Sequence, residues 1–526
     1  MRDKLRELLQ PCYIYALLGS GAAVSLICSF FFSAAAVVTW LYVAALALYA
    51  CRPQSMLYRI GLRGDLPVKR LLAVLVALVT IAVCILPMGE FSIWNGEIPA
   101  HRNQYELMAE AFLDGRLDFA YGDEDQLAGL VNPYDPNERA EAGVYYHWDH
   151  AYYKGKYYMY FGVVPVLLVF LPYRALTGMS LTTYHGTQLF VAATVAGIFA
   201  LFYLLMKLFF KKLPFGVYLT LAAAFSVMSV WYASAEPALY CTAITAALAL
   251  QTWSIWFFVR AVWGDGSENK RIVFAAIGAL LGALVFGCRP PIALANVLVI
   301  PMLYVFLRKN KFTWKLLFKL VLAALPYAAV AAGLMLYNYA RFEDPFEFGQ
   351  AYQLTVADQS NYKITLNGQM LLNIFNNTAE NLFGLGIITE EFPHLNHGGV
   401  YGNFPILLLT AAAFKPSVRQ QLKAHQLRPL LIGLIVSMLL ISAIDIMWTP
   451  YLLERYRMDI YFLAGIACFL SIGLWMQDSG KVSRGRIGMA VMLLSFVTVV
   501  SCFLFFLRTA SVYYPDWVAE IGAILT

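Results

Sequence analysis

Long apolar stretches recur along the whole chain and restrict what it can fold into. Most are about 17 to 25 residues long, which is the length that a helix needs to cross the hydrocarbon core of a bilayer. We predict thirteen spanning helices, at 12–31, 33–51, 71–91, 187–209, 213–233, 237–261, 272–288, 290–307, 319–339, 403–414, 429–446, 457–475 and 487–508. Because a chain inside lipid must satisfy its own backbone hydrogen bonds, this pattern predicts an all-α integral membrane protein, with residues 1–526 forming a single polytopic membrane domain. Whether 12–51 forms two helices or one long helix is left open.

The composition excludes the soluble classes of protein. Hydrophobic residues make up 60% of the chain and charged residues 13%, with a mean hydropathy of +0.64, whereas soluble domains are about 45–50% apolar and about 25% charged. An aromatic content of 15% also excludes an intrinsically disordered chain. The eight cysteines lie in or beside apolar stretches and form no CxxC or Cys/His cluster. They therefore indicate neither a zinc site nor a disulfide framework.

Basic residues are concentrated in seven short segments between the apolar stretches. These segments hold 26 of the 38 lysines and arginines but only five acidic residues. They are 2–7, 52–70, 207–212, 260–271, 308–319, 415–428 and 481–486. Because the cytoplasmic loops of membrane proteins carry an excess of Lys and Arg, we place these segments in the cytoplasm. The sequence therefore predicts a multi-pass protein of the cell (plasma) membrane with a cytoplasmic N-terminus.

Two long segments fall on the outer side in this topology, 92–186 and 340–402. Within the first, residues 103–113 have helical periodicity, which predicts a helix lying on the outer membrane surface. The apolar stretch 160–178 is predicted to be a re-entrant or interfacial helix, because a crossing there would invert the orientation of every later loop. Two prolines within it also favour a broken segment over a continuous span.

The segment 145–162 carries aromatic residues that alternate with an acid, two histidines and two lysines. Aromatic faces stack on the apolar C–H faces of sugar rings. The candidate sugar-binding residues are Trp148, Tyr153, Tyr158 and Tyr160. Asp149 could bind hydroxyl groups or act as a general base. The alternative is an aromatic belt at the membrane interface with snorkelling lysines, although such a belt does not require an acid between two histidines.

Basic residues on the outer side are few, and several lie at helix ends. An arginine within a membrane span is energetically costly and marks a candidate functional site. Arginine forks suit phosphate and pyrophosphate oxygens, and a lysine can hold phosphate as a point charge. The candidate phosphate-binding residues are Arg289, Arg341, Arg455 and Lys156. The alternative is that acids at the same depth neutralise the arginines, namely Glu236, Asp445, Glu454 and Asp459.

Two further groups of acids bear on catalysis. Glu97 lies about six residues beyond the end of a predicted span and is a second candidate base. The run 123–125 has the DxD form of a divalent-cation site, but it lies in an acidic tract where a solvated surface is the favoured reading. No HExxH or HxxxH spacing occurs, so no metal ligand is assigned and a divalent cation stays an alternative. No Walker loop, GxGxxG or GxSxG motif is present either, so an activated substrate would have to carry its own energy.

The order of these features resembles the GT-C superfamily of polytopic membrane glycosyltransferases. The surface helix has the form QY-x-L-x-A-x-A-x-L-x-G-x-L, and an aromatic, re-entrant segment follows it. Three motifs are similar to a bacterial branch of that superfamily. They are DxAYYxGKYYxYFGxxP at 149–165, RFxxPFEFGxxY at 341–352 and ERYRxD at 454–459. The resemblance covers most of residues 71–475.

The resemblance implies a hexosyl- or pentosyltransferase with a polyprenyl-phosphate-linked sugar as donor, membrane lipid as partner and no nucleic acid. Transfer to the acceptor would occur on the extracytoplasmic face, with an acid of the first outer loop as base. Many members carry an acid just before the surface helix, where this chain has residues 101–104, HRNQ. The base would then be Glu97 or Asp149, and the sequence does not choose between them.

Two other classes of protein stay open from the sequence. A transporter or lipid flippase would show two similar halves and acids at mid-depth in the membrane, but no repeat is visible and the charges gather at the outer rim. A non-catalytic membrane assembly protein would not need arginines at three separate helix ends. The sequence identifies neither the sugar nor the acceptor.

Overall fold

The computed structural model describes residues 67–88, 103–237, 239–361, 367–448, 453–512 and 515–525. Nine helices in this part of the chain are long and apolar enough to cross a membrane. The prediction of an all-α, multi-span membrane protein is confirmed for these residues, but the count of thirteen is not. The predicted spans 12–31 and 33–51 lie outside the described residues, as does Glu97.

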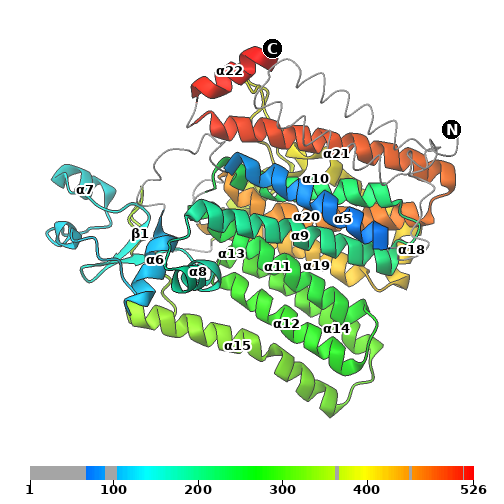
Figure 1. Cartoon of the computed structure of the whole chain (residues 1–526), viewed down its shortest axis with the longest axis horizontal. Coiled ribbons are helices and arrows are strands. Elements are labelled where there is room, and N and C mark those ends of the chain that lie inside the picture. The colour runs from blue at the N-terminus through cyan, green and yellow to red at the C-terminus, as the bar shows by residue number, and fades with distance from the viewer. Residues whose placement is uncertain are drawn as a thin grey trace.

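The long helices lie side by side and form one bundle (Figure 1). They are α9 (Thr183–Phe209), α10 (Phe215–Ala235), α11 (Leu239–Trp263), α12 (Glu268–Phe286), α15 (Trp314–Phe342), α19 (Arg428–Trp448), α20 (Glu454–Asp478) and α21 (Lys481–Ala510), with the broken span α13 (Pro290–Ala293), η5 (Leu294–Leu298) and α14 (Val299–Lys309). The apolar helix α5 (Pro67–Ile85) packs against α9 and α10 and continues into η1 (Leu86–Met88). The core centres on α20, which is buried along almost its whole length. In contrast, α15 lies at the edge, packs mainly against α12 and exposes most of its surface.

One predicted span has a different form. Residues 403–414 fold as the short helix α17 (Val400–Asn403) followed by the 3-10 helix η6 (Pro405–Phe414). At a rise of about 2.0 Å per residue, the ten residues of η6 extend only about 20 Å, which is less than the hydrocarbon thickness of a bilayer. The helix η6 packs against α20 and leads to α18 (Pro416–Ala424).

The first long segment that is predicted to lie on the outer side forms a layer at one end of the bundle (Figure 1). It contains α6 (Gln104–Leu113), η3 (Glu124–Leu127), α7 (Pro136–Ala142), the hairpin of β1 (His150–Tyr153) and β2 (Lys156–Met159), the π-helical turn η4 (Val166–Phe170) and α8 (Leu171–Thr177). The predicted surface helix corresponds to α6, which packs on η4 and α8. The apolar part of 160–178, Val166–Thr177, is shorter than the helices that could span a membrane.

The hairpin is joined to the helical bundle through a close backbone contact. The two strands are antiparallel, with His150 opposite Met159 and Tyr153 opposite Lys156. Beyond β2, the Val164 N–H donates to the Gly287 carbonyl oxygen (2.9 Å), at the end of α12. A side chain at Gly162 would collide with this same backbone, so glycine is required for the approach. This contact places the open end of the hairpin beside the turn that carries Arg289.

The second long outer segment contains α16 (Gly368–Phe383), and the chain ends in α22 (Pro515–Leu525). The helix α16 packs against α19 and α17. Before α16, residues 343–361 run back along the hairpin of the first segment, as the hydrogen bonds described below show. The two outer segments, far apart in sequence, therefore meet at the same end of the bundle.

The orientation of the bundle in the membrane stays a prediction, and labelling can test it. Met179 and Asp265 are both exposed and lie near opposite ends of the bundle, next to the starts of α9 and α12. We expect Met179→Cys to react with a membrane-impermeant maleimide from outside the cell, and Asp265→Cys to react only after the cytoplasmic side is opened. The unsubstituted chain measures the background from its own cysteines. Labelling of both positions from the same side would contradict the predicted topology.

Candidate functional site

Asp149 lies just before β1 and is held by three separate elements. Its backbone has a left-handed φ of 57°, a conformation that Asp tolerates better than most residues. The side chain is 4% exposed. Its Oδ1 accepts a hydrogen bond from the Gln353 Nε2 (2.9 Å), and its Oδ2 accepts one from the Tyr240 hydroxyl in the first turn of α11. The carboxylate is thus fixed between the hairpin, the second outer segment and the helical bundle.

Backbone hydrogen bonds place Gln353 at this position. The Asp149 N–H donates to the Leu354 carbonyl oxygen, and the Leu354 N–H donates back to the His150 carbonyl oxygen (both 2.9 Å). One further bond joins the Tyr152 N–H to the Tyr352 carbonyl oxygen (2.9 Å). Residues 352–354 therefore pair with β1 as a third strand would. The site is complete only when both outer segments are in place.

The Arg455 guanidinium lies against the ring of Tyr240, whose hydroxyl binds Asp149. It lies in the first turn of α20, is half-buried, and its guanidinium carbon is 4.0 Å from the centre of the Tyr240 ring. The same carbon is 5.6 Å from the centre of the Tyr456 ring. No carboxylate in the described part of the chain forms an ion pair with Arg455. An arginine stacked on two aromatic rings keeps its N–H groups directed sideways, where they can bind an anion.

Arg289 completes this row of residues but is already paired. Its Nε lies 2.9 and 2.6 Å from the two carboxylate oxygens of Asp459, a buried residue of α20. Its guanidinium carbon is 5.2 Å from the centre of the Tyr456 ring, so Tyr456 contacts both arginines. Asp445 of α19 is buried beside the pair. Neutralisation by acids, the alternative weighed above, therefore applies to Arg289 more than to Arg455.

The other two candidate phosphate-binding residues lie apart from this row. Arg341 is buried, with its Nη1 donating to the Met159 carbonyl oxygen (2.7 Å) and its Nη2 donating to the Asn338 Oδ1 (2.8 Å). These bonds secure the end of β2 against α15. Lys156 lies at the turn end of the hairpin, where its exposed Nζ is 3.4 Å from the Asp118 Oδ1. Neither Arg341 nor Lys156 therefore contacts the row of residues that contains Arg455.

The four candidate sugar-binding aromatics lie in three different places. Tyr153 and Tyr158 pack around the ring of Phe342, with ring centres 5.8 and 5.3 Å away, and so contribute to a small apolar cluster. Trp148 lies beside Tyr146. Tyr160 contacts Phe161 (5.1 Å), whose ring in turn contacts Tyr240 (5.3 Å). Of the four, Tyr160 is therefore linked most directly to the Asp149 and Arg455 row.

A polar network behind the hairpin supports the backbone of Asp149. The Gln104 Nε2 of α6 donates to the Asp149 carbonyl oxygen (3.0 Å). The His150 Nδ1 lies 2.9 Å from the Trp148 carbonyl oxygen, and its Nε2 lies 2.8 Å from the Tyr121 hydroxyl. Since the carbonyl can only accept, this geometry assigns the His150 proton to Nδ1 and leaves Nε2 to accept from Tyr121. Burial raises the pKa of the Tyr121 hydroxyl, and the neighbouring Asp123 charge adds to this, which keeps it a donor.

The carboxylates of Asp123 and Glu124, in the DxD run at 123–125, accept hydrogen bonds from other groups of the protein. The Asp123 carboxylate accepts from the His147 Nε2 (3.0 Å), and the Glu124 Oε1 accepts from the backbone N–H groups of Tyr121 and Gly122 (2.7 and 3.0 Å). Partial burial raises the pKa of Glu124, but the backbone hydrogen bonds outweigh this and lower it overall. Among the described residues, no group of three or more His, Cys, Asp or Glu side chains is arranged to hold a metal ion.

Sequence reasoning missed Tyr240, Gln353 and Tyr456. Tyr240 is one of 33 tyrosines and lies at the end of a predicted span, where tyrosine is common at a membrane interface. Gln353 follows the motif at 341–352 by one residue, and its role depends on a strand pairing across about two hundred positions. Of the three, only Tyr456 could have been singled out from the sequence, because it lies between two arginines in the motif at 454–459.

These features define a polytopic helical membrane protein with an acid, two arginines and several aromatic rings gathered at one end of its bundle. No protein-family model matches the sequence, and a comparison with curated proteins finds no match. Among solved structures, the chain is similar to the crystal structure of ArnT from Cupriavidus metallidurans bound to undecaprenyl phosphate. The similarity covers 85% of this chain and 77% of that chain, with 13% sequence identity and a TM-score of 0.42. A likeness at this level assigns neither a ligand nor an activity to the present chain.

Proposed function

We propose that the protein is an integral membrane glycosyltransferase that moves a sugar from a polyprenyl-phosphate donor to an acceptor on the extracytoplasmic face. One observation carries the proposal: Asp149, Tyr240, Arg455, Tyr456 and Arg289 form a continuous row of contacts where the outer layer meets the bundle. A base and an anion-binding group are the two elements that such a transfer requires. The resemblance of the sequence to GT-C glycosyltransferases supports the same reaction.

Arg455 would bind the donor phosphate. It is half-buried, lacks an ion-pair partner among the described residues, and lies where α20 begins at the end of the bundle. A guanidinium fork matches two phosphate oxygens at once. Arg289 would contribute positive charge next to it, although its pairing with Asp459 means that it acts as part of a fixed ion pair rather than as a free cation.

Asp149 would act as the base. In the proposed step the acceptor hydroxyl gives its proton to the Asp149 carboxylate, and its oxygen forms a bond to the anomeric carbon of the sugar. The bond between that carbon and the phosphate oxygen breaks, and its electron pair leaves with the lipid phosphate, whose charge Arg455 stabilises. The hydrogen bonds from Tyr240 and Gln353 would hold the carboxylate in place and ionised, since bonds donated to the charged form favour it.

The leaving group explains why the chain needs no nucleotide motif. A polyprenyl phosphate carries its own activation, and its isoprenoid chain would remain in the bilayer beside the bundle. Tyr160 and Phe161, next to Tyr240, are positioned to contact the sugar ring between the base and the phosphate. Glu97, the competing base, lies outside the described residues, so the parallel assay in the Discussion decides between the two acids.

Binding of the lipid with and without its phosphate tests the proposal. The full chain in detergent should be stabilised by a polyprenyl phosphate, because a ligand that binds only the folded state raises the free energy of unfolding. The gain is about 2.7 kcal/mol when the ligand concentration is one hundred times its Kd, and it appears as a higher unfolding temperature. The matched polyprenol, which lacks the phosphate, should produce little or no shift. Equal shifts from the two lipids would overturn the proposal that the outer end of the bundle recognises a phosphate.

Whether the sugar–phosphate bond of the donor lipid is broken distinguishes a transferase from a flippase. In liposomes that contain the protein, a polyprenyl-phosphate-linked hexose or pentose should lose its sugar and yield free polyprenyl phosphate when an acceptor is supplied. A donor that moves between leaflets with its sugar–phosphate bond intact would instead identify a transporter. Mass spectrometry of the extracted lipid distinguishes the two products.

A further inference from the structure

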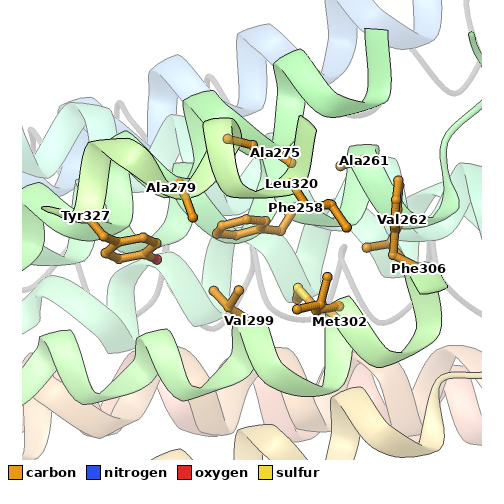
Figure 2. Close-up of a pocket in the computed structure, with 13 residues that line it drawn as sticks. Phe258, Ala261, Val262, Ala275, Ala279, Val299, Met302, Phe306, Leu320 and Tyr327 are labelled. Atoms are coloured by element: carbon orange, nitrogen blue, oxygen red, sulfur yellow. The ribbon is translucent and has the colours of Figure 1, made fainter. Parts of the chain in front are cut away.

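A second charged and apolar feature lies at the end of the bundle opposite Asp149. A cavity of about 110 Å³ is lined by residues of four helices, α11, α12, α14 and α15. Figure 2 shows Val299 and Met302 pointing from α14 towards the rings of Phe258 and Tyr327. The walls of the cavity are almost entirely apolar, and the Tyr327 hydroxyl donates a hydrogen bond to the Asn296 Oδ1 (3.0 Å). An apolar cavity of this kind excludes water and accepts hydrocarbon.

The cavity runs inwards from the loop end of these helices. Leu320 and Tyr327 lie six and thirteen residues after Trp314, the first residue of α15, which at about 1.5 Å per residue is about 9 and 20 Å along the helix. Leu303 of α14, which also lines the cavity, is 40% exposed. The cavity therefore extends along α15 and is open on the side where Leu303 is exposed.

Two basic side chains touch the lining of the cavity at its loop end. The Arg271 guanidinium carbon is 4.6 Å from the centre of the Phe306 ring, and the Arg271 Nε donates to the Ala261 carbonyl oxygen (2.7 Å). The Lys309 Nζ donates to the Val262 carbonyl oxygen (3.3 Å). Phe306, Ala261 and Val262 all line the cavity. The Arg271 Nη1 also donates to the Asn310 Oδ1 (3.2 Å) and its Nη2 to the Val262 carbonyl oxygen (3.4 Å). Each Nη still has a second N–H, and the Lys309 ammonium has two further donors, so both groups can also bind an anion.

The surrounding loops are strongly positive. Segments 260–271 and 308–319 together hold eight basic and two acidic residues, a net charge of +6, which equals the formal net charge of the whole chain. Basic pockets between transmembrane helices favour anionic lipid headgroups. A zwitterionic lipid would gain less from this charge because its own cation opposes it, and a soluble anion would gain nothing from the apolar cavity beside it.

We propose that one anionic phospholipid binds here, with part of an acyl chain in the cavity between α11, α12, α14 and α15 and its phosphate at Arg271 and Lys309. This site is separate from the site at Asp149 and does not depend on the proposed transferase activity. The bound lipid would fill the space where α15, which packs mainly against α12, separates from α14. It would therefore stabilise the position of α15, whose other end carries Arg341 against β2.

Lipid retention by the full chain tests this proposal. Native mass spectrometry of the detergent-purified protein should show one bound phosphatidylglycerol at concentrations where phosphatidylcholine with identical acyl chains is not retained. Each basic residue near an anionic lipid strengthens its binding about fivefold. The double variant Arg271→Gln, Lys309→Gln should therefore bind phosphatidylglycerol about 25-fold more weakly, whereas Arg271→Lys should retain most of the affinity.

Matched variants separate a built site from the general charge of this end of the bundle. Lys423→Gln with Lys481→Gln removes the same two charges from exposed positions near the end of α20, away from the cavity, and should leave binding within about twofold. Ala323→Phe places a ring in the cavity and should displace the lipid without any change in charge. Equal retention of the two lipids, or an equal loss in the Lys423 and Lys481 variant, would overturn the proposal.

Discussion

Asp149→Asn should reduce sugar transfer about 10²- to 10⁴-fold, the usual loss when a general base is removed. The substitution keeps the size of the side chain and an oxygen that can accept from the Tyr240 hydroxyl. It removes the negative charge and the ability to take up a proton. Because the geometry of the hairpin is retained, the loss should appear in kcat, while binding of the donor lipid phosphate by Arg455 should change little.

Glu97→Gln is the parallel assay that assigns the base. If Asp149 is the base, Glu97→Gln should retain most of the activity. Near-normal turnover of Asp149→Asn together with a collapse of Glu97→Gln would reverse the assignment, and normal turnover of both would remove the acid–base mechanism. Glu141→Gln makes the same chemical change at an exposed position of α7 in the outer layer and should leave the rate unchanged.

Tyr240→Phe and Gln353→Leu distinguish positioning from catalysis. Each removes one hydrogen bond to the Asp149 carboxylate, and each should raise the apparent pKa of the base, because these bonds favour its ionised form. We therefore expect the acidic limb of the rate profile to move to higher pH, with activity partly restored as the pH rises. Tyr240→Phe keeps the ring against Arg455 and so should leave lipid binding intact.

The helical architecture could be predicted because hydrophobic length is a local property of the sequence. The span predicted at 213–233 is α10 at Phe215–Ala235, and the span at 457–475 lies within α20. The span at 403–414 is the informative exception. It is apolar and ends before a basic segment, but Pro405 begins a 3-10 helix of ten residues that packs beside α20, and hydropathy does not distinguish this from a crossing helix.

The site could be predicted only in part, for a physical reason. Arg289 and Arg455 were recognisable because a charge next to apolar sequence is costly and needs an explanation. Asp149 was recognisable because an aromatic belt does not require an acid between two histidines. Arg341 satisfied the same rule, but its guanidinium bonds to the Met159 carbonyl oxygen and the Asn338 side chain. Charge alone indicates that a residue matters. Whether it holds the fold or a ligand depends on partners that are distant in the sequence.

Arg455→Ala should weaken binding of a polyprenyl phosphate about 30- to 4,000-fold. This range corresponds to the 2–5 kcal/mol that truncation of one partner in a desolvated charge pair typically costs. Arg455→Lys keeps the charge but loses both the planar fork and the stacking on Tyr240, so we expect an intermediate loss. The measurement is a titration of the full chain with the lipid phosphate, with the polyprenol as the neutral reference.

Substitution of Arg289 would test phosphate binding less clearly than substitution of Arg455, because Arg289 is paired with a buried acid. Arg289→Ala would leave Asp459 buried without its cation, a change that typically costs 3–5 kcal/mol of stability and would reduce binding indirectly. Arg455 forms no ion pair in the described residues and interacts with Glu236 and Asp459 only at longer range, so its removal should lower the unfolding temperature less than removal of Arg289. Arg508→Ala removes one positive charge from the end of α21 and serves as the control for surface charge, with an expected loss below threefold. If Arg508→Ala and Arg455→Ala weakened binding equally, the lipid phosphate would be responding to the net charge of this end of the bundle rather than to a guanidinium fixed on Tyr240.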